Sequence, residues 1–225
     1  SAASKTYDGS TNAVITVGTL SGLVGTETLT VSGAGSFASK NVGNYSINTT
    51  YSLIDAGSGA TEGLASNYTL SNDNLNASIS AKVLSISGSS AASKTYDGST
   101  NAVITAGTLS GLVGTETLTV SGAGSFASKN VGSYNINTTY SLSDAGVGAT
   151  AGLASNYTLG NESLSASISA KALSISGSSA ASKTYDGTIN AVITAGTLSG
   201  LVGTETLTVS GAGSFASKNV GSYNI

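Results

Sequence analysis

The fold is decided by the stretch Tyr45-Ser46-Ile47-Asn48-Thr49-Thr50-Tyr51-Ser52-Leu53, in which apolar and polar side chains alternate. Successive side chains of a β-strand point to opposite faces, so a period of two is typical of a half-buried strand. We expect Tyr45, Ile47, Tyr51 and Leu53 to face a core, with the polar residues facing solvent. This stretch therefore predicts a β-fold.

The rest of the chain supports strands over helices. Residues 28–32 and 77–81 also alternate, Thr69 separates Tyr68 from Leu70, and the β-branched run 13–17 favours a more buried strand. The chain has 30 Gly among 225 residues, and Gly, Ser, Thr and Asn interrupt it every few positions. These residues are poor helix formers, so no long helix is expected.

The dominant feature of the sequence is a tandem repeat. Ser-Ala-Ala-Ser-Lys-Thr-Tyr-Asp-Gly at 1–9 returns at 90–98 and at 179–187, an offset of 89 residues each time. The first two copies differ at 11 of 89 positions, and the third copy ends at Ile225. A period of 89 is too long for a rung of a solenoid and long enough for an independent small domain.

The alternation changes phase near Lys82, and this sets the predicted domain boundaries. Apolar residues occupy odd positions in 77–81 and even positions at Leu84 and Ile86, and a one-residue slip turns a strand over. We therefore predict repeat 1 at 1–82, with its opening strand missing, a complete repeat 2 at 83–171, and a partial repeat 3 at 172–225. The glycine- and serine-rich stretch 88–93 is the rival boundary.

The number and spacing of strands predict the architecture. Seven or eight short strands per repeat, separated by turns, favour an all-β chain of tandem small β-sandwich (Ig-like) domains with an 89-residue period. The alternatives are an elongated β-solenoid or β-grasp-like modules.

Composition excludes several functions. The chain has 8 Lys, no Arg and 11 acidic residues, a net charge of -3, which does not suit nucleic-acid or anionic-lipid binding. It has no Cys and no His, and no apolar run long enough to span a membrane. Glu27 with Asp55 or Glu62 fails as a glycosidase pair, because Ala151 replaces Glu62 in the next copy. We expect no enzyme, no cofactor and no membrane insertion.

The first recurring motif is Tyr-Asp-Gly. Asp-Gly is a strong turn signal, and we expect the tyrosine ring to lie on the core with its hydroxyl on a backbone partner. The alternative makes the aspartate a calcium ligand, although calcium prefers about six to eight oxygens and each repeat has few acidic residues. The weak calcium candidates are Asp8, Asp97 and Asp186.

The second motif is Phe-Ala-Ser-Lys-Asn-Val-Gly, at 37–43 in the first copy. It predicts a core phenylalanine followed by a turn. A Lys–Asn isopeptide cross-link is the alternative, and it needs a buried acid beside the pair. The structural-motif residues of the chain are Tyr7, Asp8, Gly9, Phe37, Lys40, Asn41, Tyr68, Tyr96, Asp97, Gly98, Phe126, Lys129, Asn130, Tyr157, Tyr185, Asp186, Gly187, Phe215, Lys218 and Asn219.

Taken in order, the motifs at 5–9, 18–27 (Gly-Thr-Leu-Ser-Gly-Leu-Val-Gly-Thr-Glu), 37–43, 65–70 (Ala-Ser-Asn-Tyr-Thr-Leu) and 77–88 (Ala-Ser-Ile-Ser-Ala-Lys-Val-Leu-Ser-Ile-Ser-Gly) carry a resemblance. The chain resembles the YDG-type repeat of filamentous-haemagglutinin-like bacterial surface proteins. The resemblance implies β-rich tandem modules, a secreted or cell-surface location, roles in adhesion, aggregation or biofilm, and no catalytic residues.

Three functions are therefore open. The first is a stalk or fibre region of a secreted bacterial cell-surface adhesin. The alternatives are a self-assembling extracellular matrix filament and a glycan- or receptor-binding module with exposed tyrosines. The expected partners are neighbouring repeats of the same chain, and then identical chains in a fibre or a host or glycan receptor.

Overall fold

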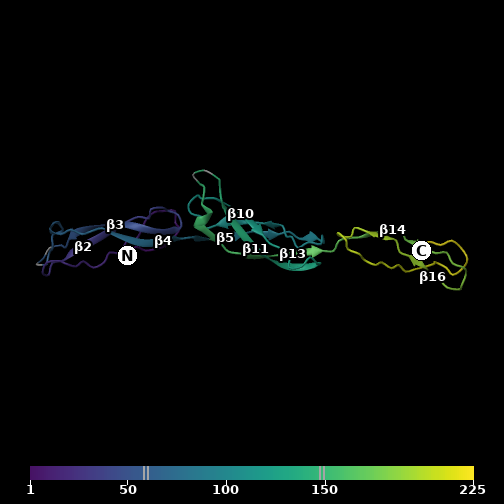
Figure 1. The fold of residues 1–225 in the computed structure, drawn as a ribbon. Helices are drawn as coiled ribbons and strands as arrows, with labels where there is room; N and C mark the ends of the chain where they lie inside the picture. Colours follow the sequence, from purple (N-terminus) through teal and green to yellow (C-terminus); the bar gives the residue numbers. More distant parts are fainter. Residues whose placement is uncertain (58, 60, 147, 149) are drawn as a thin grey trace. The chain divides into compact units, whose positions relative to one another are not determined.

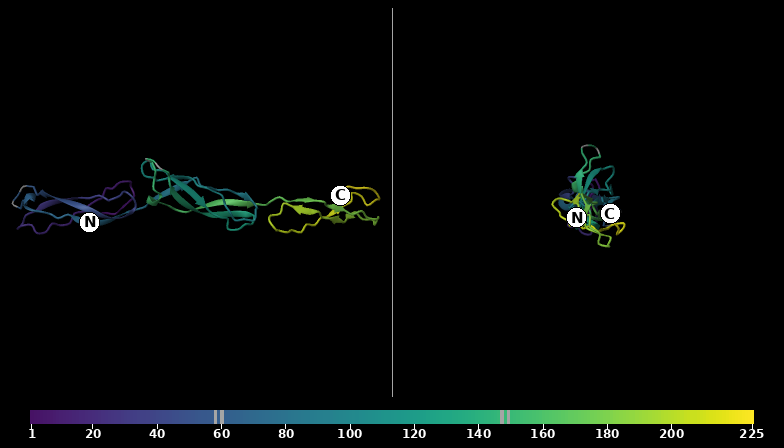
Figure 2. Two further views of the ribbon diagram at one scale, coloured as in Figure 1. Left: turned by 45° about the horizontal axis from the view of Figure 1, so that its top comes forward. Right: turned by 90° about the vertical axis from the view of Figure 1, so that its right-hand side faces the viewer.

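The computed structural model describes residues 1–57, 59, 61–146, 148 and 150–225, and it is all-β with sheets curled into half-barrels (Figure 1). The predicted all-β class is confirmed. Strands and loops fill both views of Figure 2. The helical elements among the described residues are two single 3₁₀ turns. The chain divides into two compact units: unit 1 is Ser1–Ser90, Ile104–Ala123 and Thr138–Glu162, and unit 2 is Ala91–Val103, Gly124–Asn137 and Ser163–Ile225.

Repeat 1 contains one four-stranded sheet. Its elements are β1 (Lys5–Thr6), β2 (Leu29–Ala34), β3 (Gly43–Asp55), η1 (Ala65–Asn67) and β4 (Asp73–Ser80). The strand order is β1-β4-β3-β2, with β3 antiparallel to both neighbours and β1 parallel to β4. The short strand β1 thus places the Tyr-Asp-Gly motif at the carboxyl end of β4.

The strand predicted at 45–53 is confirmed as the centre of β3. Tyr45 pairs with Ala77 and Ile47 with Leu75, while Ile47 and Thr49 are buried and their neighbours along the strand are exposed. Alternation gives β3 one core face and one solvated face, as expected for an antiparallel sheet. The expectation that every polar residue of the stretch faces solvent is wrong at Thr49, which lies on the same face as Ile47 and is buried.

The remaining strands lie in repeats 2 and 3. They are β5 (Lys82–Ser87), β6 (Ser90–Ala91), β7 (Lys94–Thr95), β8 (Ile104–Thr105), β9 (Thr108–Ser110), β10 (Leu118–Ala123), β11 (Gly132–Asp144), β12 (Tyr157–Leu159) after η2 (Ala154–Asn156), β13 (Glu162–Ser169), β14 (Ser174–Ser176), β15 (Ser179–Ala180), β16 (Asn190–Ala191), β17 (Ile193–Thr194), β18 (Thr197–Ser199) and β19 (Gly213–Ser214). The strand β10 pairs with β11 in the register that β2 has with β3.

The change of phase near Lys82 is a break between two strands. The strand β4 ends at Ser80 and joins the sheet of repeat 1, whereas β5 begins at Lys82 and joins the sheet β12-β5-β9. Tyr157–Leu159 pairs in parallel with the first residues of β5. The corresponding residues 68–70 form no strand, so the strand expected there is found in repeat 2 only. The domain boundaries themselves stay a prediction.

The expectation of a more buried strand at 13–17 is wrong. Ile15 forms only an isolated bridge with Ala2, and the Val14 side chain is 69% exposed. The backbone carbonyl of Val14 accepts a hydrogen bond from the backbone amide of Ala3, outside any regular strand ladder. Successive side chains of an extended segment point to opposite faces, and only the face of Ala13, Ile15 and Val17 is partly covered, which is why the apolar run is half buried.

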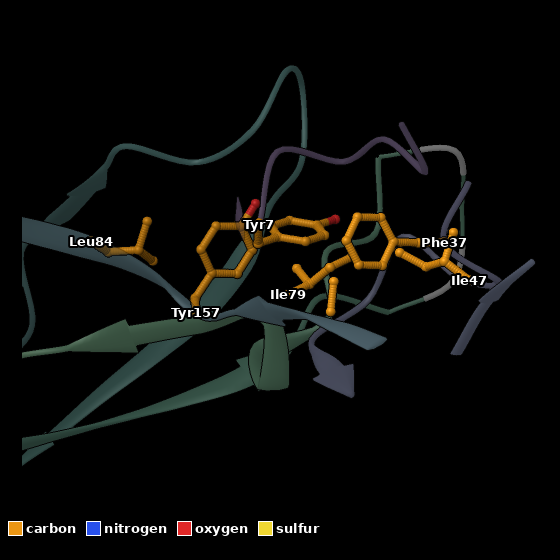
Figure 3. Close-up of a cluster of buried hydrophobic side chains, with 7 residues drawn as sticks. Tyr7, Phe37, Ile47, Ile79, Leu84 and Tyr157 are labelled. Carbon is orange, nitrogen blue, oxygen red and sulfur yellow. The ribbon is translucent and has the colours of Figure 1, made fainter. Parts of the chain in front are cut away.

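The core of unit 1 is a cluster of buried side chains, shown in Figure 3. Its members are Tyr7, Phe37, Ile47, Ala77, Ile79, Leu84 and Tyr157. The first five belong to repeat 1 and the last two to repeat 2, so within unit 1 the apolar core continues across the predicted boundary.

Candidate functional site: the joint between consecutive repeats

The Tyr-Asp-Gly motif forms a tight turn that fixes the position of Tyr7. The Asp8 carboxylate accepts the Ser10 amide at 2.8 Å and the Lys5 ammonium at 2.8 Å. Gly9 has φ +78°, a conformation that L side chains rarely adopt. The predicted turn is therefore present, and it holds the Tyr7 ring at the end of the sheet of repeat 1.

The same turn recurs in the other two copies, and in each copy the aspartate that was a calcium candidate bonds a lysine instead. Lys94 bonds Asp97 at 2.9 Å and Lys183 bonds Asp186 at 2.9 Å. The lysine hydrogen bond lowers the pKa of Asp8, Asp97 and Asp186 to about 2. Within the described ranges no three acidic side chains gather as a metal site. These aspartates serve as turn residues paired with lysine.

The hydroxyl of Tyr7 reaches a carboxylate of repeat 2. It donates to Glu116 Oε1 at 2.6 Å, and the hydroxyl of Tyr157 donates to Glu116 Oε2 at 2.6 Å. The backbone partner expected for Tyr7 is therefore wrong. A carboxylate has two oxygens that accept at once, and bonds to a charged acceptor are stronger than bonds to a carbonyl. Glu116 thus connects one tyrosine from each repeat.

The two tyrosine rings also pack on each other. Their centroids are 5.3 Å apart at an interplanar angle of 79°, the edge-to-face arrangement that aromatic pairs prefer (Figure 3). Burial raises the pKa of Tyr157 to about 12, and burial with the hydrogen bond to Glu116 raises the pKa of Tyr7 still further. Both phenols are therefore held in the neutral form that donates to the carboxylate.

A second set of contacts lies beside the tyrosines. The Asn156 side chain, fully buried, accepts the Val42 amide at 2.9 Å and donates to Asn41 Oδ1 at 3.0 Å. Lys40 lies 3.7 Å from Glu116, but its side chain is 52% exposed. The isopeptide alternative, which needs a buried acid beside a Lys–Asn pair, stays a prediction. Asn41 contributes to the joint through its amide.

The turn residue Gly9 lies against Val113 of repeat 2, in a space that leaves no room for a side chain. A Cβ atom built on Gly9 would lie 2.9 Å from Val113 Cγ1, closer than real Cβ contacts. The amide of Val113 donates to the hydroxyl of Tyr157 at 3.0 Å. We call the whole set the joint: it comprises Tyr7, Gly9, Asn41 and Val42 from repeat 1, and Val113, Glu116, Asn156 and Tyr157 from repeat 2.

Part of the joint recurs 89 residues further along, in unit 2. The hydroxyl of Tyr96 donates to Glu205, and a Cβ atom on Gly98 would lie 3.0 Å from Val202 Cγ1. The hydrogen bond to Glu205 raises the pKa of Tyr96. Two successive boundaries therefore use the same residue types in the same roles.

The other predicted motif residues support the fold. Phe37 and Phe126 are buried, and the ammonium of Lys5 lies 5.3 Å from the Phe37 ring, with equivalent pairs at 5.4 Å and 5.5 Å in the other copies. The backbone amides of three asparagines each donate to the serine hydroxyl two residues earlier; these are Asn41, Asn130 and Asn219. Their predicted role as fold markers stays a prediction for the residues outside the joint.

Sequence reasoning missed Glu116, Asn156 and Val113 as joint residues. One signal was available: Glu27, Glu116 and Glu205 are the same in all three copies, whereas Glu62 is replaced. A retained acid in a chain with few charges indicates a fixed partner. The identity of that partner, a tyrosine of the neighbouring repeat, requires the three-dimensional arrangement.

Comparisons with known proteins complete the description. Among the described residues, no helix has the length and apolarity needed to cross a bilayer. No curated protein and no solved structure matches the chain significantly. The family model of the YDG domain matches residues 1–75, 80–166 and 169–225. These matches cover nearly the whole chain, and the protein therefore belongs to the YDG domain family.

Proposed function

We propose that this chain is the structural repeat region, a stalk or fibre, of a secreted bacterial cell-surface adhesin that supports adhesion, aggregation or biofilm formation. The observation that carries the proposal is the recurrence of the joint. Tyr7 with Glu116 and Tyr96 with Glu205 connect successive repeats through the same bond. A contact repeated at successive boundaries suits a stalk, because it restricts bending between repeats that the covalent backbone alone would allow.

The character of the chain also supports this proposal. Among the described residues the turn aspartates pair with lysine, and Tyr7 and Tyr157 lie in the buried core of unit 1, which is the behaviour expected of structural residues. The near-identity of the copies favours a function that depends on the number of repeats. The resemblance to repeats of bacterial surface proteins supplies the expected location.

The experiment is single-molecule pulling of the full 225-residue chain between its ends. A stalk resists load, so we expect discrete unfolding events. A fully unfolded repeat of 89 residues releases about 300 Å of chain. The matched control is a Gly/Ser linker of equal length, which extends smoothly. A featureless extension of the native chain at the same low force as the linker contradicts the stalk function.

The adhesin context needs a separate test on cells. Bacteria displaying the chain on their surface should adhere to abiotic surfaces or to one another more than cells displaying the Gly/Ser linker. Equal adherence of the two strains argues against a direct role in adhesion, and would leave the mechanical result to stand alone.

A further inference from the structure

The sheets of repeats 1 and 2 each end in a strand whose outer edge is open. These strands are β2 and β10, and each stands at one end of a four-stranded sheet (Figure 1). Each is six residues long, with the sequence Leu-Thr-Val-Ser-Gly-Ala. The strand β2 pairs with β3, and β10 pairs with β11. Among the described residues, the backbone groups of β2 and β10 have no hydrogen-bond partner outside these two neighbours.

The open edge is a property of the repeat itself. The strand β2 is followed by the whole of repeat 2, and β10 is preceded by the whole of repeat 1 and by β5. Because the two strands have the same sequence, a cover supplied by the preceding repeat would lie on β10, and a cover supplied by the following repeat would lie on β2. Neither strand is covered, so neighbouring repeats of the same chain leave this edge open.

The opposite edge of each sheet carries features that hinder pairing with another chain. The edge strand β1 has only two residues, and one of them is Lys5, whose ammonium bonds Asp8 at 2.8 Å. In repeat 2 the two-residue strand β7 and Lys94 repeat this arrangement. Short edge strands and lysines both block the addition of a further strand. The strands β2 and β10 have no charged residue and no proline. The same contrast in two repeats favours a partner at the open edge.

The chemistry of the open edge fits another extended strand. A row of unpaired backbone N–H and C=O groups is complementary to the same row on a second strand. The outward side chains of β2 are exposed and uncharged, with Thr30 and Ser32 at its centre, and β10 presents the same residue types. An identical strand therefore meets the edge without the repulsion that like charges cause across a sheet.

We propose that two copies of this chain associate side by side, through antiparallel pairing of β2 or β10 of one copy with β2 or β10 of the other. The contact joins like with like about a two-fold axis, so both strands present the same surface. Because the pairing is short and uncharged, it is weak at one edge and insensitive to salt. Each chain carries two such strands, so both must be changed to remove the contact.

Sedimentation velocity of the full chain over a range of concentrations tests the pairing. The variant Ser32→Lys with Ser121→Lys places one lysine on each open edge, at exposed positions where a substitution hardly affects the fold of a free chain. We expect the native chain to associate increasingly as its concentration rises. The double variant should associate about fivefold more weakly or worse, because like charges then face each other across the new pair.

The matched control moves the same charges one strand inward. Ser52 lies directly opposite Ser32 in the register of β3 with β2, and Ser141 lies opposite Ser121 in the register of β11 with β10. Both side chains are exposed. Ser52→Lys with Ser141→Lys therefore changes the net charge equally and leaves the edges as they are. Its association should equal that of the native chain.

A mixture of opposite charges gives the decisive sample. The partner variant is Ser32→Glu with Ser121→Glu, which should also associate weakly when it is alone. An equimolar mixture of the lysine and glutamate variants should associate at least as strongly as the native chain, because opposite charges then meet across the pair. Recovery in the mixture also shows that both variants are folded.

Amide hydrogen exchange locates the contact. At high concentration the native chain should gain protection in residues 29–34 and 118–123, and the protection of β3 should stay unchanged. Four results overturn the inference: a native chain that is monomeric up to about 1 mM, a control that loses as much association as the edge variant, a mixture no stronger than its components, or an unchanged exchange of both edge strands.

The inference goes beyond the proposed function and does not rest on it. A chain that resists pulling and stays monomeric would refute the pairing and leave the stalk intact. A chain that pairs but extends without resistance would refute the stalk and leave the pairing intact.

Discussion

Tyr7 and Tyr157, which are 150 residues apart in the sequence, meet edge to face and share one carboxylate. Their rings lie 5.3 Å apart, and each hydroxyl is 2.6 Å from a different oxygen of Glu116. An aromatic contact and two charge-assisted hydrogen bonds stabilise the same place. The boundary between the two repeats is therefore part of the packed interior of unit 1, and changes at Glu116 should affect both repeats.

Glu116→Ala should destabilise unit 1 by about 2–4 kcal/mol, because it leaves two largely buried phenols without their acceptor. Urea unfolding monitored by tyrosine fluorescence measures this. The matched control is Glu27→Ala, which removes one hydrogen bond from the half-buried Tyr68 of repeat 1, and it should cost about 1 kcal/mol. Equal losses in the two variants would show that the bond to Tyr7 adds nothing.

The joint should weaken in alkali. The pKa of Tyr157 rises from 10.0 to about 12 on folding, and that of Tyr7 rises further, so the folded state favours the neutral phenols. Their contribution is complete below pH 10, where the unfolded chain is also protonated. It is lost as the pH rises from 10 through 12, on the order of 2 kcal/mol for Tyr157.

Urea unfolding at several pH values, with phenolate absorbance at 295 nm, measures this alkaline loss. Tyr157→Phe is the control: its free energy of unfolding should be lower at neutral pH and flatter between pH 10 and 12. A native profile as flat as that of the variant would contradict the assignment of the alkaline loss to the joint.

Gly9→Ala and Gly187→Ala separate backbone strain from contact. Both glycines lie in the same turn, at φ +78° and +76°, so alanine is strained by about 1 kcal/mol at either position. Only at Gly9 does the new methyl group meet Val113, while the Gly187 position is open. The shift in urea midpoint should therefore correspond to at least about 1 kcal/mol more for Gly9→Ala.

Asn156→Ala should destabilise unit 1 by about 1–3 kcal/mol, because it leaves the Val42 amide without its acceptor. Asn67→Ala changes the same position of repeat 1, where the side chain is exposed, and should be nearly neutral. Amide hydrogen exchange at Val42 gives a local readout. Unchanged protection of that amide in Asn156→Ala would rule out the bond as a stabilising contact.

The sequence predicted the elements that depend on local pattern. The alternation at 45–53 gave β3, and the Asp-Gly pair gave the turn with a positive φ at Gly9. Local pattern failed at Val14, where an apolar side chain lies on the uncovered face of its segment. Burial depends on what lies above a strand, and that is not encoded in the strand itself.

The joint was beyond local reasoning for a related reason. Tyr7 and Glu116 are 109 positions apart, and their partnership arises from the stacking of one repeat on the next. The strand expected at 68–70 shows the same dependence: its counterpart at Tyr157–Leu159 is ordered by pairing with β5, and residues 68–70 have no such neighbour among the described residues. Near-identical sequences thus differ in structure where their surroundings differ.

The placement of the joint has a genetic consequence. Tyr7 and Glu116 belong to two neighbouring copies, and Tyr96 and Glu205 repeat the arrangement one period later. Unequal recombination between copies removes or inserts a whole number of 89-residue periods, and every new boundary then carries a tyrosine on one side and a glutamate on the other. The length of the protein is thereby free to vary among descendants without any compensating mutation.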